Sequence, residues 1–271
     1  MKKIYAHRGL SNEYVPNSLE SIIACMDKNY IDGIEIDVRM TKDKRFVLFH
    51  DKKINGHCAK KGKIIDYNLN ELTSINFKLK RIEYYNKIFG TINKKDGKAI
   101  RNNIKKIRNM TYKIVTLDKV LEIINNKELL IEIKCENLEE FDINAFYYLI
   151  KLYAGKKISI QNFNKNIIAG LRKIDKNLNL GLLLTIKDLK LNSYYNFYSI
   201  EYLLITKNKI DSSLIRNKAI NLWTVNYYED LDKIFRNINS KINVINYITD
   251  NPLIIYNVLK RLLNPLVDPL V

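Results

Sequence analysis

The sequence predicts an α/β protein that folds as a (β/α)8 TIM-like barrel with a small basic insertion. Short apolar runs alternate with helical patterns through most of the 271 residues. Many of these runs are apolar on successive residues, as expected for strands that are buried on both faces. Repeated alternation of strand and helix favours a parallel sheet covered by helices, and nine candidate strands suit a closed barrel better than an open sheet.

The expected strands are Ile4–Ala6, Ile34–Val38, Phe46–Phe49, Leu129–Ile133, Ile158–Ile160, Leu180–Leu184, Tyr202–Ile205, Leu222–Val225 and Val244–Ile248. A barrel of this class has eight strands, so one candidate is surplus, and Tyr202–Ile205 is the weakest. The expected helices are Ser18–Lys28, Leu117–Asn126, Ile143–Tyr153, Asn166–Asn177, Tyr228–Ile238 and Pro252–Leu263. Asn17 or Ser18 is a suitable N-cap for the first helix. Between Val38 and Phe46 there is no room for a helix, so the chain must return there along an extended segment.

We expect one domain over residues 1–271, because no repeat or low-complexity linker divides the chain. Residues 78–113 lack clear strand signals and are rich in Lys, Arg and Asn, so they are expected to form an insertion. Two interpretations stay open for this segment. It is either a solvated excursion, or a lid or patch that faces a substrate or a membrane.

The net charge of +17 has three interpretations. It could attract nucleic acid or an anionic membrane surface, it could attract a small phosphate-bearing substrate, or it could reflect a general bias of composition. The lysines are spread along the chain, which favours the last. The three cysteines, Cys25, Cys58 and Cys135, form neither a zinc pattern nor a disulfide framework, so a reduced, cytoplasmic location is expected. No apolar run is long enough to predict a membrane span.

Two of the three histidines lie where an apolar strand ends and a polar loop begins. His7 follows the strand Ile4–Ala6, and His50 follows the strand Phe46–Phe49. In barrels of this class the active site lies at such strand ends, so the shared position favours a catalytic role for both. The third histidine, His57, lies in a polar loop and is interpreted as incidental.

Glu35 and Asp37 are two residues apart on an expected strand, so both side chains point to the same face. If that face is the barrel interior, the two carboxylates need a cation nearby, because burial and mutual repulsion are both costly. Oxygen ligands of this kind favour Mg²⁺ or Ca²⁺. The alternative is a half-exposed strand with both carboxylates facing solvent.

Glu132 and Lys134 share one face of the apolar strand Leu129–Ile133 and its end. Glu132 could complete a metal site, and Lys134 could hold a phosphate oxygen as a point charge. A simple salt bridge explains this pair equally well. Trp223, the only tryptophan, lies near the end of another strand, where it is either part of the core or the apolar wall of a substrate pocket.

These residues lie in motifs that resemble the glycerophosphodiester phosphodiesterase family in both order and spacing. The motifs are Ala6-His7-Arg8-Gly9, Asn17-Ser18, Glu35-Ile36-Asp37-Val38, Thr41-Lys42-Asp43, His50-Asp51, Thr116-Leu117-Asp118-Lys119-Val120-Leu121, Glu132-Ile133-Lys134, Gln161-Asn162-Phe163, Trp223-Thr224-Val225-Asn226 and Ile248-Thr249-Asp250-Asn251-Pro252. The N-terminal cluster is the most specific of them, and the resemblance spans nearly the whole chain.

The resemblance implies a (β/α)8 barrel with a divalent metal, Mg²⁺ or Ca²⁺, and a small-molecule glycerophosphodiester as substrate. It implies that His7 and His50 are the general acid and base and that Arg8 and Lys134 bind the phosphate. Trp223 is assigned to the substrate pocket from its position at a strand end. The implied metal ligands are Glu35, Asp37 and Glu132. In the family, the glycerol hydroxyl next to the phosphate is thought to attack first, and water then opens the cyclic phosphate that results.

The chain departs from the family pattern at two places. Pro16 stands where the family has a carboxylate before the first helix, so an interaction near the metal is in doubt. The family also tends to carry an arginine a few residues after its second His-Asp pair, and Gly56 or its neighbours occupy that place here. The central motif residues are intact, and we therefore expect an active enzyme.

Three functions are weighed. The first is metal-dependent hydrolysis of glycerophosphodiesters to glycerol 3-phosphate and an alcohol. The second is a phospholipase D-like phosphodiesterase that acts on lipid head groups, with the basic insertion in peripheral contact with an anionic membrane. The third is a catalytically inactive barrel kept for binding. Nucleic acid is not expected as a partner, and no sequence feature sets an oligomeric state.

Overall fold

Eight parallel strands form a closed barrel in the computed structural model of the protein, which describes residues 2–79, 107, 109–184, 195–206, 218–237 and 244–263. The barrel strands are β1 (Lys3–His7), β2 (Gly33–Met40), β6 (Glu128–Ile133), β7 (Ile158–Asn162), β8 (Asn179–Leu184), β9 (Phe197–Glu201), β10 (Ala219–Trp223) and β11 (Val244–Thr249). They pair in the order β1-β11-β10-β9-β8-β7-β6-β2, and β1 also pairs with β2, which closes the ring. The predicted fold class is confirmed.

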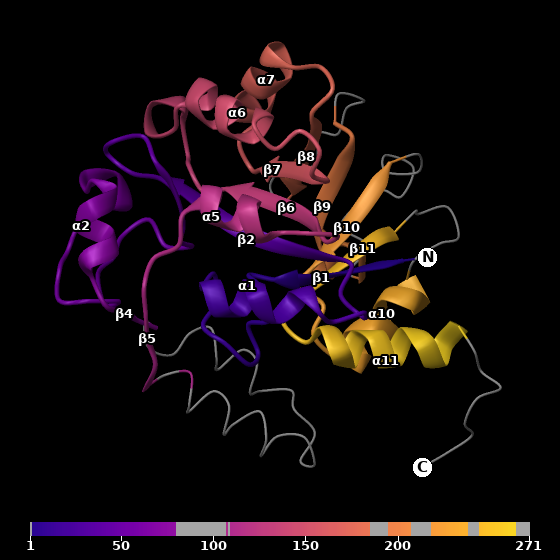
Figure 1. Cartoon of the computed structure of the whole chain (residues 1–271). Coiled ribbons are helices and arrows are strands. Elements are labelled where there is room, and N and C mark those ends of the chain that lie inside the picture. Colours follow the sequence, from indigo (N-terminus) through magenta and orange to yellow (C-terminus); the bar gives the residue numbers. More distant parts are fainter. Residues whose placement is uncertain are drawn as a thin grey trace.

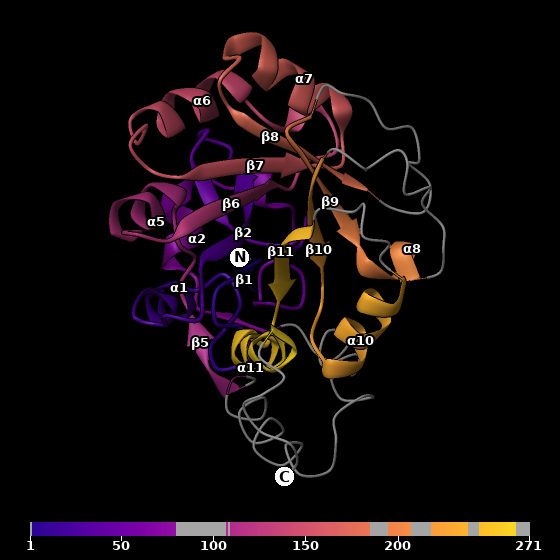
Figure 2. The same ribbon diagram turned by 90° about the vertical axis from the view of Figure 1, so that its right-hand side faces the viewer.

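Helices lie around the outside of this barrel, as Figures 1 and 2 show from two directions. They are α1 (Leu19–Met26), α5 (Leu117–Ile123), α6 (Ile143–Lys151), α7 (Lys165–Ile174), α8 (Tyr202–Thr206), α10 (Tyr228–Asn237) and α11 (Pro252–Leu263). All six predicted helices are found, with ends that differ by a few residues at most. Ser18 is the N-cap of α1, because its side chain accepts a hydrogen bond from the backbone N–H of Ser21.

The surplus strand is β3 (Phe46–Leu48), which pairs antiparallel with β2 at the edge of the barrel sheet. The segment Tyr202–Ile205, predicted as a weak strand, is instead helical within α8, and that prediction is wrong. The barrel strand at this point is β9, directly before it. A run of four apolar residues fits a buried strand and a buried helical turn equally well. The strand β9 was not predicted because its inward polar residues, Ser199 and Glu201, interrupt the apolar run.

The remaining elements lie beside β3. They are α2 (Leu69–Ser74), the 3₁₀ turns η1 (Ile64–Asp66) and η2 (Leu138–Glu140), and the short antiparallel pair β4 (Phe77–Lys78) and β5 (Thr111–Tyr112). The pair β4–β5 joins the two ends of the predicted insertion 78–113. Residues 80–106 and 108 of that segment lie outside the described residues, and the single-domain division stays a prediction. None of the described helices is long and apolar enough to cross a membrane.

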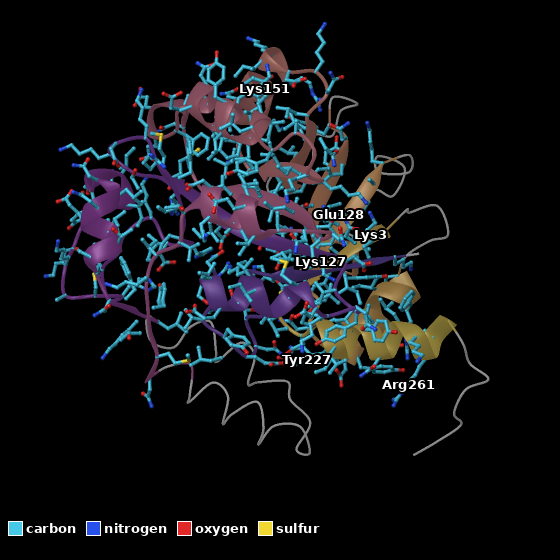
Figure 3. The ribbon with its side chains drawn as sticks, in the orientation of Figure 1. Lys3, Lys127, Glu128, Lys151, Tyr227 and Arg261 are labelled. Carbon is cyan, nitrogen blue, oxygen red and sulfur yellow. The ribbon has the colours of Figure 1, made fainter. Side chains whose placement is uncertain are left out.

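Alternation along each strand separates two cores. Residues such as Ile34, Ile36 and Leu129 point outward and pack under the helices in the main core. Inside the barrel, an apolar cluster is formed by Tyr5, Leu130, Phe197 and Ile248. At the amino-terminal ends of β1 and β6, Lys3 pairs with Glu128 at 2.5 Å, and the two side chains lie together in Figure 3.

Buried polar side chains from four strands also form a hydrogen-bonded layer inside the barrel. Ser199 donates to Gln161, Asn221 donates to Ser199 at 3.2 Å, and Asn246 donates to Asn221 at 2.7 Å. These hydrogen bonds offset much of the cost of burying the layer, although Asn246 Oδ1 has no hydrogen-bond partner among the described residues. The barrel interior thus contains both an apolar cluster and a polar layer.

Gly181 on β8 tests how closely the interior is packed. A Cβ atom at this position would overlap the ring of Phe197 on the neighbouring strand. We expect Gly181→Ala to lower the free energy of unfolding by about 1–3 kcal/mol, the usual cost of overpacking a filled core. Chemical denaturation measures this change. In the control Gly155→Ala, the new Cβ meets no heavy atom within 4 Å, and stability should stay within about 0.5 kcal/mol. Equal stability of the two variants would contradict close packing at Gly181.

Candidate active site

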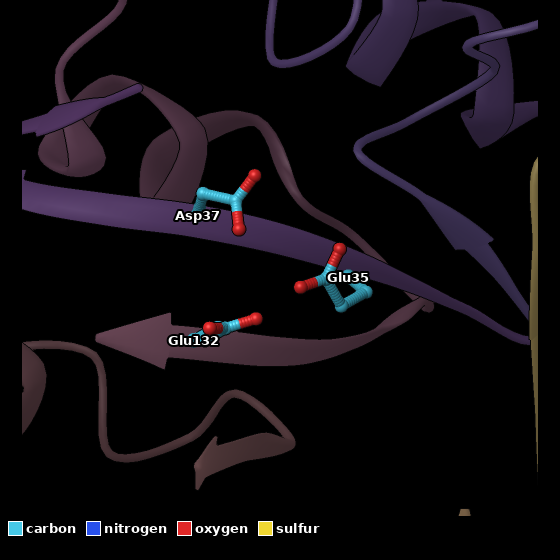
Figure 4. A group of neighbouring side chains, drawn as sticks. All are labelled: Glu35, Asp37 and Glu132. Atoms are coloured by element: carbon cyan, nitrogen blue, oxygen red, sulfur yellow. The ribbon is translucent and has the colours of Figure 1, made fainter. Parts of the chain in front are cut away.

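Three buried carboxylates meet at the carboxyl-terminal ends of β2 and β6. Glu35 and Asp37 both point into the barrel because they are two residues apart on β2. Glu132 on β6 is the register partner of Asp37. Oxygen atoms of the three groups lie within 4.8 Å of one another, and Figure 4 shows the side chains converging. Their exposed fractions are 2%, 0% and 7%, so almost no water reaches them to offset their repulsion.

Two cationic side chains lie against this carboxylate cluster. Arg8 Nε is 2.8 Å from Asp37 Oδ2, and Lys134 Nζ is 2.6 Å from Glu132 Oε1 and 3.3 Å from Asp37 Oδ1. Burial raises the pKa of Asp37, but the charges of Arg8 and Lys134 outweigh it and hold that pKa well below its ordinary value. Burial lowers the pKa of Lys134, and the two carboxylates more than reverse this.

Glu35 is the least compensated member of the cluster. Burial, followed by the charges of Asp37 and Glu132, raises the pKa of Glu35 well above its ordinary value. Burial also raises the pKa of Glu132, against the opposing charge of Lys134. Three carboxylates against two cations leave a negative site built from hard oxygen donors. These residues therefore fit a divalent cation of the Mg²⁺ or Ca²⁺ type.

Asn17 links the cluster to the loop after β1. Its Nδ2 donates to Asp37 Oδ2 at 2.8 Å, and its Oδ1 accepts from the backbone N–H of Asp37 at 3.1 Å. Asn17 adopts a φ of 59°, which asparagine tolerates better than most residues. Pro16 offers no carboxylate beside it, so the hydrogen bonds to Asp37 come from Asn17.

His7 is held from behind by an aspartate. Its Nδ1 lies 2.7 Å from Asp250 Oδ1, an oxygen that also accepts from Ser11 Oγ at 3.1 Å. Asn226 Nδ2 donates to the other oxygen of Asp250 at 2.7 Å. An ionised carboxylate only accepts, so Nδ1 of His7 is the donor. Nε2 of the same ring then faces the carboxylate cluster, 3.9 Å from Glu35 Oε2.

His50 is held in a similar way by the residue that follows it. Its Nδ1 lies 2.9 Å from Asp51 Oδ1, and the second oxygen of Asp51 lies 3.1 Å from His57 Nε2. Arg39 donates to the backbone carbonyls of both His50 and Lys134. Burial lowers the pKa of His50, although the hydrogen bond to Asp51 works against this shift. The neutral ring is therefore favoured at neutral pH.

A cavity of about 570 Å³ opens over these groups. Seven of the eight predicted site residues line it, namely His7, Arg8, Glu35, His50, Glu132, Lys134 and Trp223. Asp37, the eighth, lies behind them with no exposed surface. On the far wall, Trp223 packs edge-on against Phe163 with ring centroids 6.2 Å apart. The cavity thus joins an acidic and cationic floor to an aromatic wall.

The sequence model of the Glycerophosphoryl diester phosphodiesterase family matches residues 7–254. The chain belongs to this family. It is therefore a phosphoric diester hydrolase, and the predicted enzyme class and family are confirmed. A glycerophosphodiester phosphodiesterase from Caldanaerobacter subterraneus subsp. tengcongensis is 25% identical over 271 residues, which cover 95% of this chain and 98% of that protein.

Solved structures of other family members share the fold. A glycerophosphodiester phosphodiesterase from Thermotoga maritima superposes with a TM-score of 0.65 at 20% identity, covering 95% of this chain and 98% of its own. A phosphodiesterase from Oleispira antarctica, in complex with the product sn-glycerol-3-phosphate, superposes with a TM-score of 0.71 at 18% identity. That match covers 96% of this chain and 97% of the Oleispira chain.

Four residues of this phosphodiesterase site were not predicted. Asp51 and Asp250 lie in quoted motifs but received no role, because a sequence does not show which side chain faces a histidine. Arg39 is two residues after Asp37 on β2, so the alternation of side chains along a strand could have predicted that it points to the same face as Glu35 and Asp37. His57 was interpreted as incidental, but its ring contacts Asp51, the residue that supports His50.

Glu35→Gln tests whether the carboxylate cluster holds an ion. Because the pKa of Glu35 is raised in the folded protein, its protonation favours folding, and the stability linked to it rises as the pH falls from neutral. We therefore expect Glu35→Gln to stabilise the metal-free protein at neutral pH by roughly 1 kcal/mol, or about 2–4 °C in Tm. The same change should weaken Mg²⁺ or Ca²⁺ binding by ~10-fold or more, seen as a loss of the rise in Tm that the ion causes.

The matched control for this prediction is Glu122→Gln, an exposed carboxylate on α5 paired with Lys119. It should change neither the Tm of the metal-free protein nor the ion-dependent rise. An unchanged ion-dependent rise in Glu35→Gln would show that the ion does not bind at this cluster.

Proposed function

We propose that this phosphodiesterase hydrolyses glycerophosphodiesters to glycerol 3-phosphate and an alcohol, with a divalent metal and with His7 and His50 as acid and base. One observation carries the proposal. Two histidines, each held at Nδ1 by an aspartate, turn their Nε2 sides to one cavity that has a cluster of buried carboxylates at its floor. The Oleispira structure with sn-glycerol-3-phosphate supports this choice of product.

Glu35, Asp37 and Glu132 would hold the ion, Mg²⁺ or Ca²⁺. When bound, the ion neutralises charge that develops on the phosphoryl oxygens. Arg8 and Lys134 line the same cavity and would bind the phosphate oxygens of the substrate through their positive charge. These roles use the two cations that already lie against the carboxylates.

Each histidine would move one proton in each half of the reaction. His50 would be the general base, because its lowered pKa keeps Nε2 unprotonated at neutral pH. Nε2 can then take the proton of the glycerol hydroxyl next to the phosphate. His7, beside Glu35 and Asp250, would donate a proton to the oxygen of the leaving alcohol. A cyclic phosphate results, and the histidines exchange roles when water opens it.

The aromatic wall would receive the part of the substrate beyond the phosphate. Trp223 and Phe163 form it, with Glu201 and Tyr202 on the same side of the cavity. Substrates of this kind are deacylated lipid head groups, so the proposed activity would belong to lipid metabolism. The three cysteines are free thiols, which supports the proposed cytoplasmic location.

Replacement of either histidine tests the mechanism. We expect His7→Ala and His50→Ala each to lower the kcat for glycerophosphocholine by ~10²–10⁴-fold, the usual contribution of a general acid or base. Chelation by EDTA should abolish turnover, and added Mg²⁺ or Ca²⁺ should restore it.

Lys151→Ala, an exposed change on α6 away from the cavity, is the control and should keep full activity. Full turnover in both histidine variants, or no turnover of the unchanged protein with any divalent metal, would refute the mechanism.

A further inference from the structure

The two active-site histidines have matching supports that differ in one residue. Behind His7, one oxygen of Asp250 accepts from the ring and the other accepts from Asn226 Nδ2 at 2.7 Å. Behind His50, one oxygen of Asp51 contacts the ring and the other contacts His57 Nε2 at 3.1 Å. The second oxygen of the supporting aspartate thus contacts an amide behind His7 and an imidazole behind His50.

We infer that His57 is a positioning residue for His50 and acts through Asp51. It holds the carboxylate in the orientation that keeps Nδ1 of His50 as the donor and Nε2 directed at the cavity. The inference rests on the proposed function, in which Nε2 of His50 moves the proton. It assigns a role to a residue in the loop after β3, outside the set that lines the cavity.

The hydrogen bonds of His57 fix which atoms donate. Nε2 faces Asp51 Oδ2, and Nδ1 lies 3.2 Å from the backbone carbonyl oxygen of Lys78. Hydrogen bonds from His50 and His57 hold the pKa of Asp51 well below its ordinary value, so this carboxylate only accepts. A carbonyl oxygen also only accepts. Nε2 of His57 is therefore the donor to Asp51.

His57 is packed as a structural support and not as a surface residue. Its side chain is 10% exposed, compared with 43% for His50. Its ring packs edge-on against Phe49 with centroids 5.0 Å apart, and the backbone N–H of Lys78 donates to its carbonyl at 2.7 Å. Phe49 and Asp51 flank His50 in the chain. His57 therefore contacts the residues on both sides of the histidine that it positions.

This arrangement gives His50 a support that does not touch the substrate. Removal of His57 takes away the hydrogen bond at the second oxygen of Asp51, and the tautomer of a histidine is set by the hydrogen bond at its other nitrogen. The expected effect is a lower fraction of correctly oriented His50, which lowers kcat. Substrate binding depends on Arg8, Lys134 and the cavity wall, so KM should change little.

His57→Leu and His57→Gln test this role together. Leucine fills the space without a donor, and we expect it to lower kcat for glycerophosphocholine by ~10–100-fold with KM within about two-fold, as outer partners of active-site groups typically do. Glutamine keeps an N–H donor for Asp51 and should restore kcat to within about three-fold of the unchanged enzyme. The control Cys58→Ala, at the next residue, should keep both constants, because the Cys58 thiol donates to backbone carbonyls and packs against apolar side chains.

A second measurement needs no turnover. The chain has three histidines, so long-range ¹H–¹⁵N spectra resolve three imidazole rings. In the unchanged protein His50 should be the Nδ1–H tautomer; His57→Leu should shift it toward Nε2–H and leave His7 unchanged, while His57→Gln should keep it.

An unchanged His50 spectrum and kcat in His57→Leu would overturn the inference. So would a loss in His57→Gln as large as in His57→Leu at equal Tm. If the His50 tautomer shifts as expected but His50→Ala retains full turnover, the positioning role stands and the proposed function fails.

Discussion

The burial of three carboxylates at the ends of β2 and β6 is the constraint on which the rest of the site depends. Strand alternation turns Glu35, Asp37 and Glu132 into the barrel, where little water reaches them. Arg8 and Lys134 offset part of the resulting repulsion. The remaining negative charge makes the cluster suited to a divalent cation, and that cation would in turn bring a phosphate to the two histidines.

The carboxyl ends of the strands and the loops that follow them supply the groups that surround this cluster. His7 and His50 come from the ends of β1 and β3, and each has an aspartate at Nδ1. Asp250 comes from the end of β11, far from His7 in the chain, whereas Asp51 is adjacent to His50. The two arms therefore reach the same local geometry by different routes. In barrels of this class, residues at the carboxyl ends of the strands form the active site, whereas residues at the opposite end contribute to stability.

The strands predicted from apolar runs agree with the structure where burial alone sets the sequence pattern. The apolar runs predicted β1, β6 and β8, because strands buried on both faces leave continuous hydrophobic segments. The strand β2 was predicted from Ile34, Ile36 and Val38, although Glu35 and Asp37 alternate with them. The apolar run Tyr202–Ile205 gave a wrong prediction, because a short buried helical turn has the same composition as a buried strand. The apolar runs also failed at β9, whose inward side chains include Ser199 and Glu201. Polar layers inside the barrel break the apolar pattern while the backbone remains a strand.

The sequence by itself determined the barrel class, the family and the eight residues that converge on the site, because strand period and motif spacing are local properties. Only the tertiary structure decided which groups support them. Asp250 meets His7 because the barrel closes between β11 and β1, and Asn17 reaches Asp37 because the loop after β1 turns back over β2. His57 and Asp51 lie six residues apart in the loop after β3, and the fold of that loop places the imidazole ring on the carboxylate. The sequence shows that both residues follow β3, but not that their side chains meet.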